Sequence, residues 1–174
     1  IDQANSATGD TSVVFTISAA NTIEGSEANF TALLTDDGNN QIDIDDQDIS
    51  VSGTISVDNA NLLDTATSGT ITASIDTDET VTELKTLTGT THAYTIVIAA
   101  GDATSSSADD LNTINEKTTA AVDLTNVTAL ASSSLSDLGT LATAIGNSEF
   151  DNAAGLTTIA VSDTTIDATT LAST

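Results

Sequence analysis

The acidic stretch DDGNNQIDIDDQD, residues 36–48, combines the residue types and the spacing that could bind a divalent cation. Counted from Asp37, oxygen-bearing side chains fall at positions 1, 3, 5, 7, 9 and 12 of a calcium-binding loop. These side chains belong to Asp37, Asn39, Gln41, Asp43, Asp45 and Asp48. The pattern predicts calcium as a cofactor, with these six residues as the metal ligands.

Two positions of this stretch depart from the EF-hand pattern. Ile42 stands where the sharp turn of an EF-hand needs Gly, and Asp48 stands where a bidentate Glu is usual. No helix is predicted on either side, so an EF-hand is not expected. Two interpretations stay open: a calcium site of another geometry, or a solvated acidic hairpin that turns at Gly38–Asn40.

Two further groups of acids follow later in the chain. The first consists of Asp76, Asp78 and Glu79, and the second of Asp102, Asp109 and Asp110. Carboxylates grouped in this way could bridge calcium ions. They could equally cap helices and keep the surface soluble, and we favour this second interpretation.

Other residues that could take part in catalysis or in ligand binding are scarce. His92 is the only histidine, and a triad cannot be defined from one histidine among many Ser and Asp residues. We expect it in a turn just before a strand that begins near Tyr94. Lys85 and Lys117 are the only cations and are expected to pair with carboxylates or helix-end carbonyls. The sequence therefore predicts no catalytic residues and no enzymatic activity.

Three hydroxyl–acid pairs mark predicted helix starts. They are Thr80/Glu83, Ser107/Asp110 and Ser134/Asp137, and each has the spacing of a capping box. A leucine follows each acid directly, and Leu84, Leu111 and Leu138 recur at equal intervals of 27 residues. Apolar residues at helical spacing follow each of these leucines, so we expect short amphipathic helices.

Between these helices, branched residues alternate as they do in β-strands. The predicted strands are Thr54–Val57, Thr70–Ile75, Tyr94–Ala99, Ala121–Leu124 and Thr157–Val161. A strand, a turn and a capped helix recur about every 25 residues, within the range of solenoid proteins. For residues 54–174 we therefore predict a mainly β fold with short helices: a β/α solenoid-like repeat of parallel strands, or a small parallel sheet with helices along one side.

Residues 1–53 have a different pattern. Ser12–Ser18 and Glu27–Leu34 alternate like strands, with Phe15 and Phe30 expected to point inward. The sequence TIEGSEANFTALL resembles the early strands of immunoglobulin-like and Calx-β-type extracellular sandwiches. We expect this region to be either a β cap on the repeat or a partial Ig-like sandwich.

The net charge of the chain limits the classes of molecule that it could bind. The chain of 174 residues has 26 acids, two lysines and no arginine, which gives a net charge of −24. So few cations disfavour nucleic acid and anionic membrane surfaces as partners. High ionic strength or divalent cations would make such a surface tolerable. The chain has no cysteine and no apolar run long enough to span a bilayer.

Two segments carry a resemblance to a known class of protein. They are VSGTISVDNANLLDTATSGTITASIDTDETVTELKTLT and AVDLTNVTALASSSLSDLGTLATAIGN. Both resemble the Ala/Thr/Asp-rich tandem repeats of very large secreted surface proteins, of adhesin or surface-layer type, from marine bacteria such as cyanobacteria. The resemblance implies an extracellular array at the cell surface, and it carries over no active-site residues. At TTLAST, where the next helix is due, either the array continues or another subunit covers the open end.

The leading prediction is a non-enzymatic extracellular structural protein. It would be a repeat module of a cell-surface array, filament or surface layer that self-associates and is stabilised by calcium. Two alternatives stay open. One is a calcium-dependent adhesin that binds a glycan or another cell-surface partner, and the other is a phage fibre or decoration protein.

Overall fold

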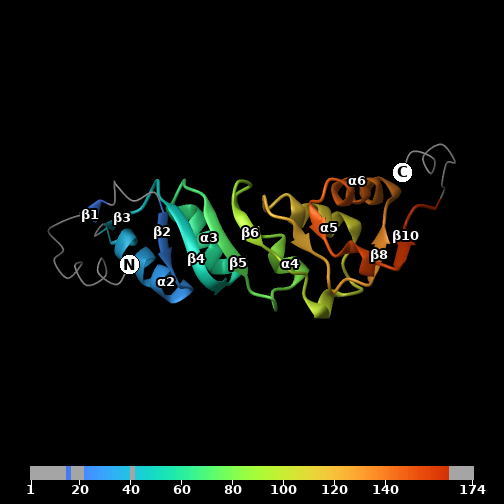
Figure 1. The fold of residues 1–174 in the computed structure, drawn as a ribbon, viewed down its shortest axis with the longest axis horizontal. Coiled ribbons are helices and arrows are strands. Elements are labelled where there is room, and N and C mark those ends of the chain that lie inside the picture. Colours follow the sequence, from blue (N-terminus) through green and yellow to red (C-terminus); the bar gives the residue numbers. More distant parts are fainter. Residues whose placement is uncertain (1–14, 17–21, 40–41, 165–174) are drawn as a thin grey trace.

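The computed structural model describes residues 15–16, 22–39 and 42–164, with side chains from residue 22 onward. The molecule is elongated, and its elements follow one another along the long axis in chain order (Figure 1). β2 (Thr22–Gly25) and α2 (Glu27–Gly38) lie near one end. α6 (Leu135–Gly146) and β10 (Thr158–Val161) lie near the other.

All strand pairs among the described residues are parallel. The remaining strands are β1 Phe15–Thr16, β3 Ile42–Asp43, β4 Asp48–Ile55, β5 Ile71–Ile75, β6 Ala93–Thr95, β7 Val122–Asp123, β8 Ala129–Ser133 and β9 Phe150–Asp151. The largest sheet has the order β2-β4-β5-β6, and the other strands form the pairs β1-β3, β7-β9 and β8-β10. In the large sheet Ile23, Ile49 and Ile71 are register partners on neighbouring strands, and all three are buried.

The helices begin at hydroxyl caps. Besides α2 and α6 they are α3 Val57–Ala66, α4 Val81–Leu84 and α5 Ala108–Asn115, with short 3-10 turns η1 Ala100–Asp102 and η2 Ala153–Gly155. A Ser or Thr hydroxyl accepts the N3 amide in every α-helix described: Ser26, Ser56, Thr80, Ser107 and Ser134. The three predicted helix starts are confirmed. α2 contacts α3, α4 contacts α5, and α5 contacts α6.

The pairing of β4 with β5 is interrupted by a register shift, and Gly53 supplies the backbone conformation found there. The register between β4 and β5 shifts between Ser50 and Thr54, so β4 carries extra residues at this point. Gly53 has a φ of +84°, a backbone conformation that costs residues with a Cβ atom energy. β4 can therefore bend and still pair with β5 at both of its ends.

The core is thin and made mostly of small aliphatic side chains. One cluster of buried residues extends from Ile23 to Phe150 along the molecule. Its largest fully buried side chains are Tyr94 and Phe30. Leu84 and Leu111, two of the evenly spaced leucines, are 1% and 0% exposed and anchor their helices in this core.

The prediction of a mainly β, solenoid-like fold is wrong. The chain is an α/β protein with about 37% helix and 26% strand. α3 and α6 have 10 and 12 residues and are longer than the short helices predicted. Among the described residues the strands fall into four separate parallel sheets, whereas a solenoid needs a ladder that continues from one turn to the next.

The prediction of an Ig-like N-terminal region is also wrong. Glu27–Leu34, predicted as a strand, lies within α2. β2 pairs with β4 and β3 pairs with β1, both in parallel, where an Ig-like sandwich has antiparallel strands. Phe30 does point inward, but from a helix. Phe30, Leu33 and Leu34 have helical spacing, and the Ser26/Asn29 capping box starts the helix.

Two further predictions about residues 1–53 stay untested. Of Ser12–Ser18, only β1 is described, and the Phe15 side chain is outside the described residues. The predicted boundary between residues 53 and 54 falls within β4. The division of the chain into regions 1–53 and 54–174 stays a prediction.

Candidate functional site

The six predicted calcium ligands lie between the end of α2 and the start of β4. Asp37 is near the C-terminus of α2, Asn39 is its C-cap, Asp43 lies on β3, Asp45 in the following turn, and Asp48 begins β4. Gln41 is outside the described residues. Ile42 and Ile44, between these ligands, are buried in the core. The stretch is therefore anchored by its apolar residues, and Asp45, Asp46 and Asp48 are exposed.

Two of these carboxylates hold the local backbone. Asp48 Oδ1 accepts the Thr70 amide at 2.7 Å, and Asp43 Oδ1 accepts the Asp45 amide at 3.2 Å. Burial raises the pKa of Asp37. The hydrogen bond from the Ile44 amide lowers this pKa in part, and the negative charges of Asp45 and Asp43 raise it further. Repulsion of this kind is what a bound cation would relieve.

The carboxylates of this stretch do not converge into a ready cation site. Within the described part of the chain, no group of three or more His, Cys, Asp or Glu side chains is arranged to hold a metal ion. The calcium site at Asp37–Asp48 therefore stays a prediction.

The acids that follow the later strands have a different role, because they reach back to helix N-termini. Each accepts the first amide of a preceding helix: Glu79 accepts Val57 N at 2.9 Å, Asp102 accepts Val81 N at 2.9 Å, and Asp163 accepts Leu135 N at 2.6 Å. For α5 the acceptor is the Ser133 hydroxyl, 2.9 Å from the Ala108 amide. These hydrogen bonds thus link the start of each helix to a side chain that lies further along the chain, at or beyond the end of a following strand.

These bonds satisfy amides that a helix cannot satisfy itself. The first amides of an α-helix lack intrahelical partners and form its positive end, where a carboxylate is favourable. Glu27 makes a comparable link from α2 to α3, because its Oε1 accepts the Ser56 amide, the Ser56 hydroxyl and Asn59 Nδ2. The hydrogen bonds from Asn59 and Ser56 lower the pKa of Glu27.

The capping interpretation is confirmed for Glu79, Asp102 and Asp110. The sequence did not reveal that the caps link different helices. A signal was present, because a side-chain acceptor directly precedes a hydroxyl residue in Glu79–Thr80, Ser133–Ser134 and Asp163–Thr164. In the first two of these pairs, the hydroxyl is the N-cap of the next helix.

The buried His92 and the partly exposed Asp64 form a polar pair. His92 Nδ1 lies 3.1 Å from the Ile71 amide and accepts its hydrogen, so the ring proton is on Nε2. Nε2 then donates to Asp64 Oδ1 at 2.6 Å. The side chain of His92 is 4% exposed. Both ring nitrogens are therefore used in internal hydrogen bonds.

Asp64 is held as a carboxylate by this arrangement. Burial acts to raise its pKa, but the hydrogen bonds from His92 and Thr88 outweigh burial and lower it. Gly89 has a φ of +74°, and a Cβ atom there would lie 2.4 Å from the His92 ring and 2.8 Å from Asp64 Oδ1. The pair thus needs glycine at this position. His92 precedes β6 directly, as predicted, but its burial was not foreseen.

Lys85 connects two helices through Asp110. Its ammonium at the end of α4 bonds Asp110 Oδ1 in the first turn of α5. Asp110 Oδ2 also accepts the amide and the hydroxyl of Ser107. Burial acts to raise the pKa of Asp110, but the bonds from Lys85 and Ser107 outweigh it and lower the pKa. The predicted pairing of Lys85 with a carboxylate is confirmed.

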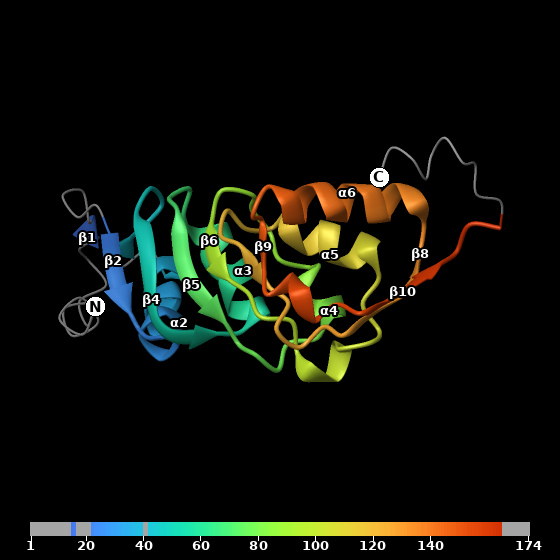
Figure 2. The ribbon, with the colours of Figure 1, turned by 45° about the vertical axis from the view of Figure 1, so that its right-hand side comes forward.

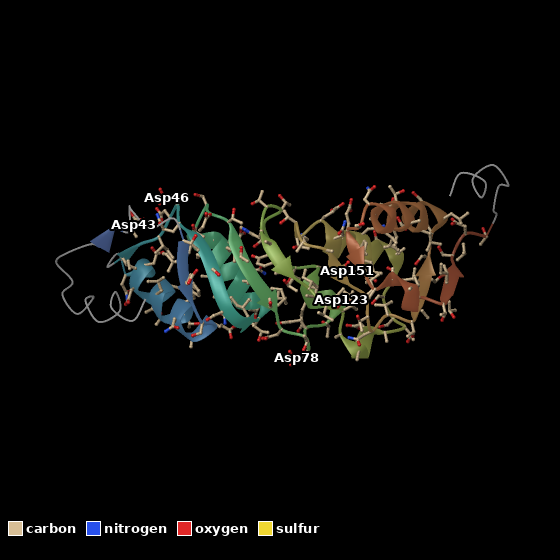
Figure 3. The ribbon with its side chains drawn as sticks, viewed as in Figure 1. Asp43, Asp46, Asp78, Asp123 and Asp151 are labelled. Carbon is tan, nitrogen blue, oxygen red and sulfur yellow. The ribbon has the colours of Figure 1, made fainter. Side chains whose placement is uncertain are left out.

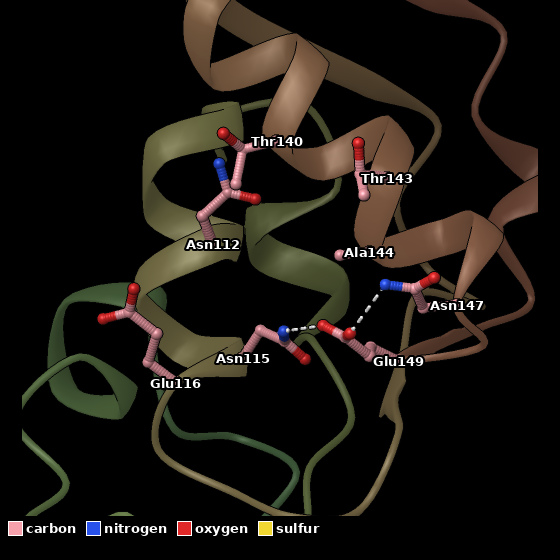
Figure 4. Close-up of a pocket in the computed structure, with 8 residues that line it drawn as sticks. All are labelled: Asn112, Asn115, Glu116, Thr140, Thr143, Ala144, Asn147 and Glu149. Atoms are coloured by element: carbon pink, nitrogen blue, oxygen red, sulfur yellow. Dashed lines mark hydrogen bonds between the residues drawn. The ribbon is translucent and has the colours of Figure 1, made fainter.

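An open polar pocket of about 380 Å³ lies between α5 and α6 (Figure 4). Glu149 accepts Asn115 Nδ2 at 2.7 Å and Asn147 Nδ2 at 3.3 Å. Asn112 donates to the Asp137 carbonyl, while its Oδ1 is buried and has no hydrogen-bond partner among the described residues. Amides, hydroxyls and a carboxylate can bind a polar, hydroxylated ligand.

A second groove, of about 330 Å³, is apolar and lies at the end of the molecule. α6 contributes most of its lining, and β8, β10 and Leu156 contribute the rest. Ile159 and Val161 of β10 are 53% and 41% exposed. Every residue of β10 is exposed, in contrast to the alternating burial of β5.

Comparison with protein-family models, with curated proteins and with solved structures finds no match for this chain. Within the described ranges, no helix combines the length and the apolar character needed to cross a membrane.

Proposed function

We propose that this protein is a non-enzymatic extracellular structural protein, a module of a cell-surface array, filament or surface layer. The observation that carries the proposal is that its carboxylates accept hydrogen bonds from backbone amides within the fold. Glu27, Glu79, Asp102 and Asp163 each accept a backbone amide at the N-terminal end of another helix. A series of such links along an elongated molecule suits a load-bearing element (Figure 1).

The bonding of His92 supports a structural role in preference to a catalytic one. A general base needs a ring nitrogen within reach of the proton that it abstracts. In His92 the Ile71 amide uses one nitrogen, and Asp64 uses the other. Use of this ring in catalysis would break a buried hydrogen bond.

The acidic surface supports an environment rich in salt and calcium. A net charge of −24 makes copies repel one another at low ionic strength. Acids are distributed along the molecule: the exposed Asp46 lies near the partly exposed Asp43 of β3, and the exposed Asp78 lies at the opposite edge (Figure 3). Calcium would bridge such carboxylates between copies, so self-association should depend on it.

The test measures assembly and stability together. Purified protein is examined by sedimentation velocity, thermal unfolding and electron microscopy, in calcium, in magnesium, and in sodium chloride of matched ionic strength. We expect calcium to lengthen the particles and raise Tm beyond the sodium control, and a chelator to reverse both effects. If sodium has the same effect as calcium, bridging by calcium is refuted.

A triple variant locates the effect. Asp37→Asn, Asp43→Asn and Asp45→Asn together should remove the calcium-dependent rise in Tm. The control neutralises three exposed acids elsewhere, Glu24→Gln, Asp58→Asn and Glu116→Gln, and therefore changes the net charge equally. Equal loss of the calcium effect in both variants would mean that calcium acts on overall charge and not at the predicted site.

The polar pocket between α5 and α6 favours a second candidate function, an adhesin that binds a glycan. The carbonyl oxygen of Asn112 is buried and lacks a partner, and sugar hydroxyls could donate to the acceptors nearby. Saturation-transfer NMR with neutral oligosaccharides, with and without calcium, tests this candidate. Thr143→Val should abolish any such signal if the pocket binds the sugar, whereas Thr65→Val on α3 should leave it unchanged.

A further inference from the structure

The polar pocket between α5 and α6 is one half of a longer polar surface. α5 and α6 lie side by side, and β9 contacts α6 (Figure 2). A second open pocket, of about 410 Å³, adjoins the first and shares Asn115, Asn147 and Glu149 with it. Glu149 therefore lies where the two pockets meet, and together they offer a longer ligand-binding surface than the first pocket alone.

The threonine hydroxyls of both pockets present oxygen lone pairs without a free hydrogen. A hydroxyl has a single hydrogen, and here each hydrogen is already donated to a backbone carbonyl. The donors and the residues whose carbonyls accept are Thr140 and Ser136, Thr143 and Gly139, Thr118 and Tyr94, and Thr119 and His92. These hydroxyl oxygens can therefore only accept further hydrogen bonds from a ligand.

Two carboxylates make the first pocket negative and add further acceptors. Glu116 and Glu149 lie on either side of Asn115 (Figure 4). Glu116 is exposed, and its carboxylate has no hydrogen-bond partner among the described residues. Glu149 accepts one hydrogen on each oxygen, from Asn115 and from Asn147, so each oxygen keeps a lone pair. The pocket thus attracts positive charge and favours hydrogen-bond donors.

The donors that the pocket retains are amide hydrogens. Asn112, Asn115 and Asn147 each donate one hydrogen of the amide group within the fold, and each keeps a second one. These hydrogens suit the oxygen of a hydroxyl. A matching ligand therefore combines an ammonium group, which donates and has no lone pair, with hydroxyls nearby. A sugar with a free amine has this combination, whereas N-acetylation removes the charge and adds a carbonyl acceptor.

We propose that this surface binds glycans whose amino sugars carry free amines. An ammonium group binds the carboxylates of Glu116 and Glu149, and neighbouring hydroxyls bind the asparagine amides. Hydrogen bonds between two charged groups are about twice as strong as neutral ones, so the ammonium decides the selectivity. The inference rests on the glycan-binding function proposed for the pocket and names the class of glycan. Acidic sugars are disfavoured because the net charge of −24 repels them.

Three probes separate the amine from the sugar ring in isothermal titration calorimetry at about pH 6, where amines are charged. They are the tetramer of β-1,4-linked glucosamine, its fully N-acetylated form, and N-acetyl-tetralysine amide, which has the same number of amines as the first but no sugar ring. Each is titrated into the full chain in sodium chloride of physiological ionic strength.

A pair of variants locates the binding. Glu116→Gln removes the unpaired carboxylate of the pocket. Because a carboxylate at the C-terminal end of a helix is unfavourable, this change should not lower Tm, and a thermal melt checks that the fold is intact. Glu24→Gln is the control, since it removes the same charge from the exposed face of β2, near the other end of the molecule (Figure 1).

The glucosamine tetramer should bind about tenfold or more tightly than its N-acetylated form, because a hydrogen bond to a charged group contributes such a factor. Glu116→Gln should remove most of this preference, whereas Glu24→Gln should leave it unchanged. Equal weakening in both variants, or equally tight binding of the lysine peptide, would mean that only charge is recognised, and would overturn the inference. If the N-acetylated tetramer binds as tightly as the free amine, the glycan-binding function stands and this inference fails. If neither tetramer binds, the glycan-binding function fails as well.

Discussion

Replacement of His92 by alanine tests whether the only histidine is a structural residue. The ring accepts the Ile71 amide and donates to Asp64, and it is almost fully buried. Alanine can make neither bond. Ile71 itself is 0% exposed, so its amide would be left in the core without a partner.

The expected loss can be worked out from these contacts. A buried amide without a partner costs about 1–3 kcal/mol, and the lost bond to a carboxylate contributes about 1.5–3 kcal/mol. The two losses share one side chain and partly overlap, so we expect His92→Ala to lower the free energy of unfolding by about 3–5 kcal/mol. In a chain of this length that corresponds to a fall in Tm of about 6–20 °C.

Thermal and urea unfolding followed by circular dichroism measure this loss at pH 7. Thr91→Ala, at the exposed neighbouring residue, is the control and should stay within about 0.5 kcal/mol of the parent. Asp64→Asn keeps an acceptor for Nε2 but removes the charge, and should cost less than His92→Ala. The structural role of His92 is refuted if its replacement costs no more than that of Thr91.

Three further predictions follow from the caps and the glycines. Glu27→Ala should cost about 1–2 kcal/mol in urea unfolding because it removes the link from α2 to α3, whereas Glu24→Ala, exposed on β2, should cost under about 0.5 kcal/mol. Gly89→Ala should cost at least about 2 kcal/mol because of its φ of +74° and its approach to His92, whereas Gly101→Ala, with open space at Cβ, should be neutral. Stability should also fall in acid, as a pH series of urea unfolding would show. Carboxyls with lowered pKa values contribute stability above about pH 4–5, and this contribution is lost as the pH drops through their folded values. These groups are Glu27, Asp64, Glu83, Asp110 and Asp123, and the raised pKa values of Asp37 and Glu79 act in the opposite direction. A flat profile from pH 6 to pH 3 would contradict this assignment.

The sequence was most informative where a local rule applies. A hydroxyl three residues before an acid is a strong local signal, because both side chains bond backbone amides of the same helical turn. Ser107 and Asp110 satisfy each other's amides in this way. The strand predicted at Thr70–Ile75 is also close to β5, since its branched residues alternate in burial. Such interactions need no knowledge of distant residues.

The helix at Glu27–Gly38 was missed because its signal is ambiguous. The apolar residues Phe30, Leu33 and Leu34 fit a helix, while Phe30, Ala32 and Leu34 also fit the alternation of a strand. The third position after Ser26 is Asn29, which bonds the Ser26 amide as an acid would but is not part of the usual pattern. In α3 the third position after Ser56 is also an asparagine, Asn59, whose backbone amide bonds the Ser56 hydroxyl.

The candidate site was less predictable than the helices because its partners are distant in sequence. Asp64 and His92 are 28 residues apart, and Glu79 and Val57 are 22 apart. No local pattern indicates which of 26 acids will meet which amide. That choice depends on how the strands align, and their register shifts and separate sheets are consequences of packing along the whole chain.

The internal caps divide the carboxylates of this protein into two groups, which should respond differently to calcium and to acid. Glu79, Asp102, Asp110 and Asp163 are bonded to amides or lysine within the fold, where calcium would have to displace a hydrogen bond. Exposed acids such as Asp58 and Asp78 can meet calcium without such a loss. Chelation should therefore separate copies while each module stays folded. Acid below about pH 3 should destabilise the module itself, because it protonates Glu27, Asp64 and Asp110, whose pKa values the fold lowers. If chelation unfolds the module and separates the copies at the same calcium concentration, the two groups are not distinct.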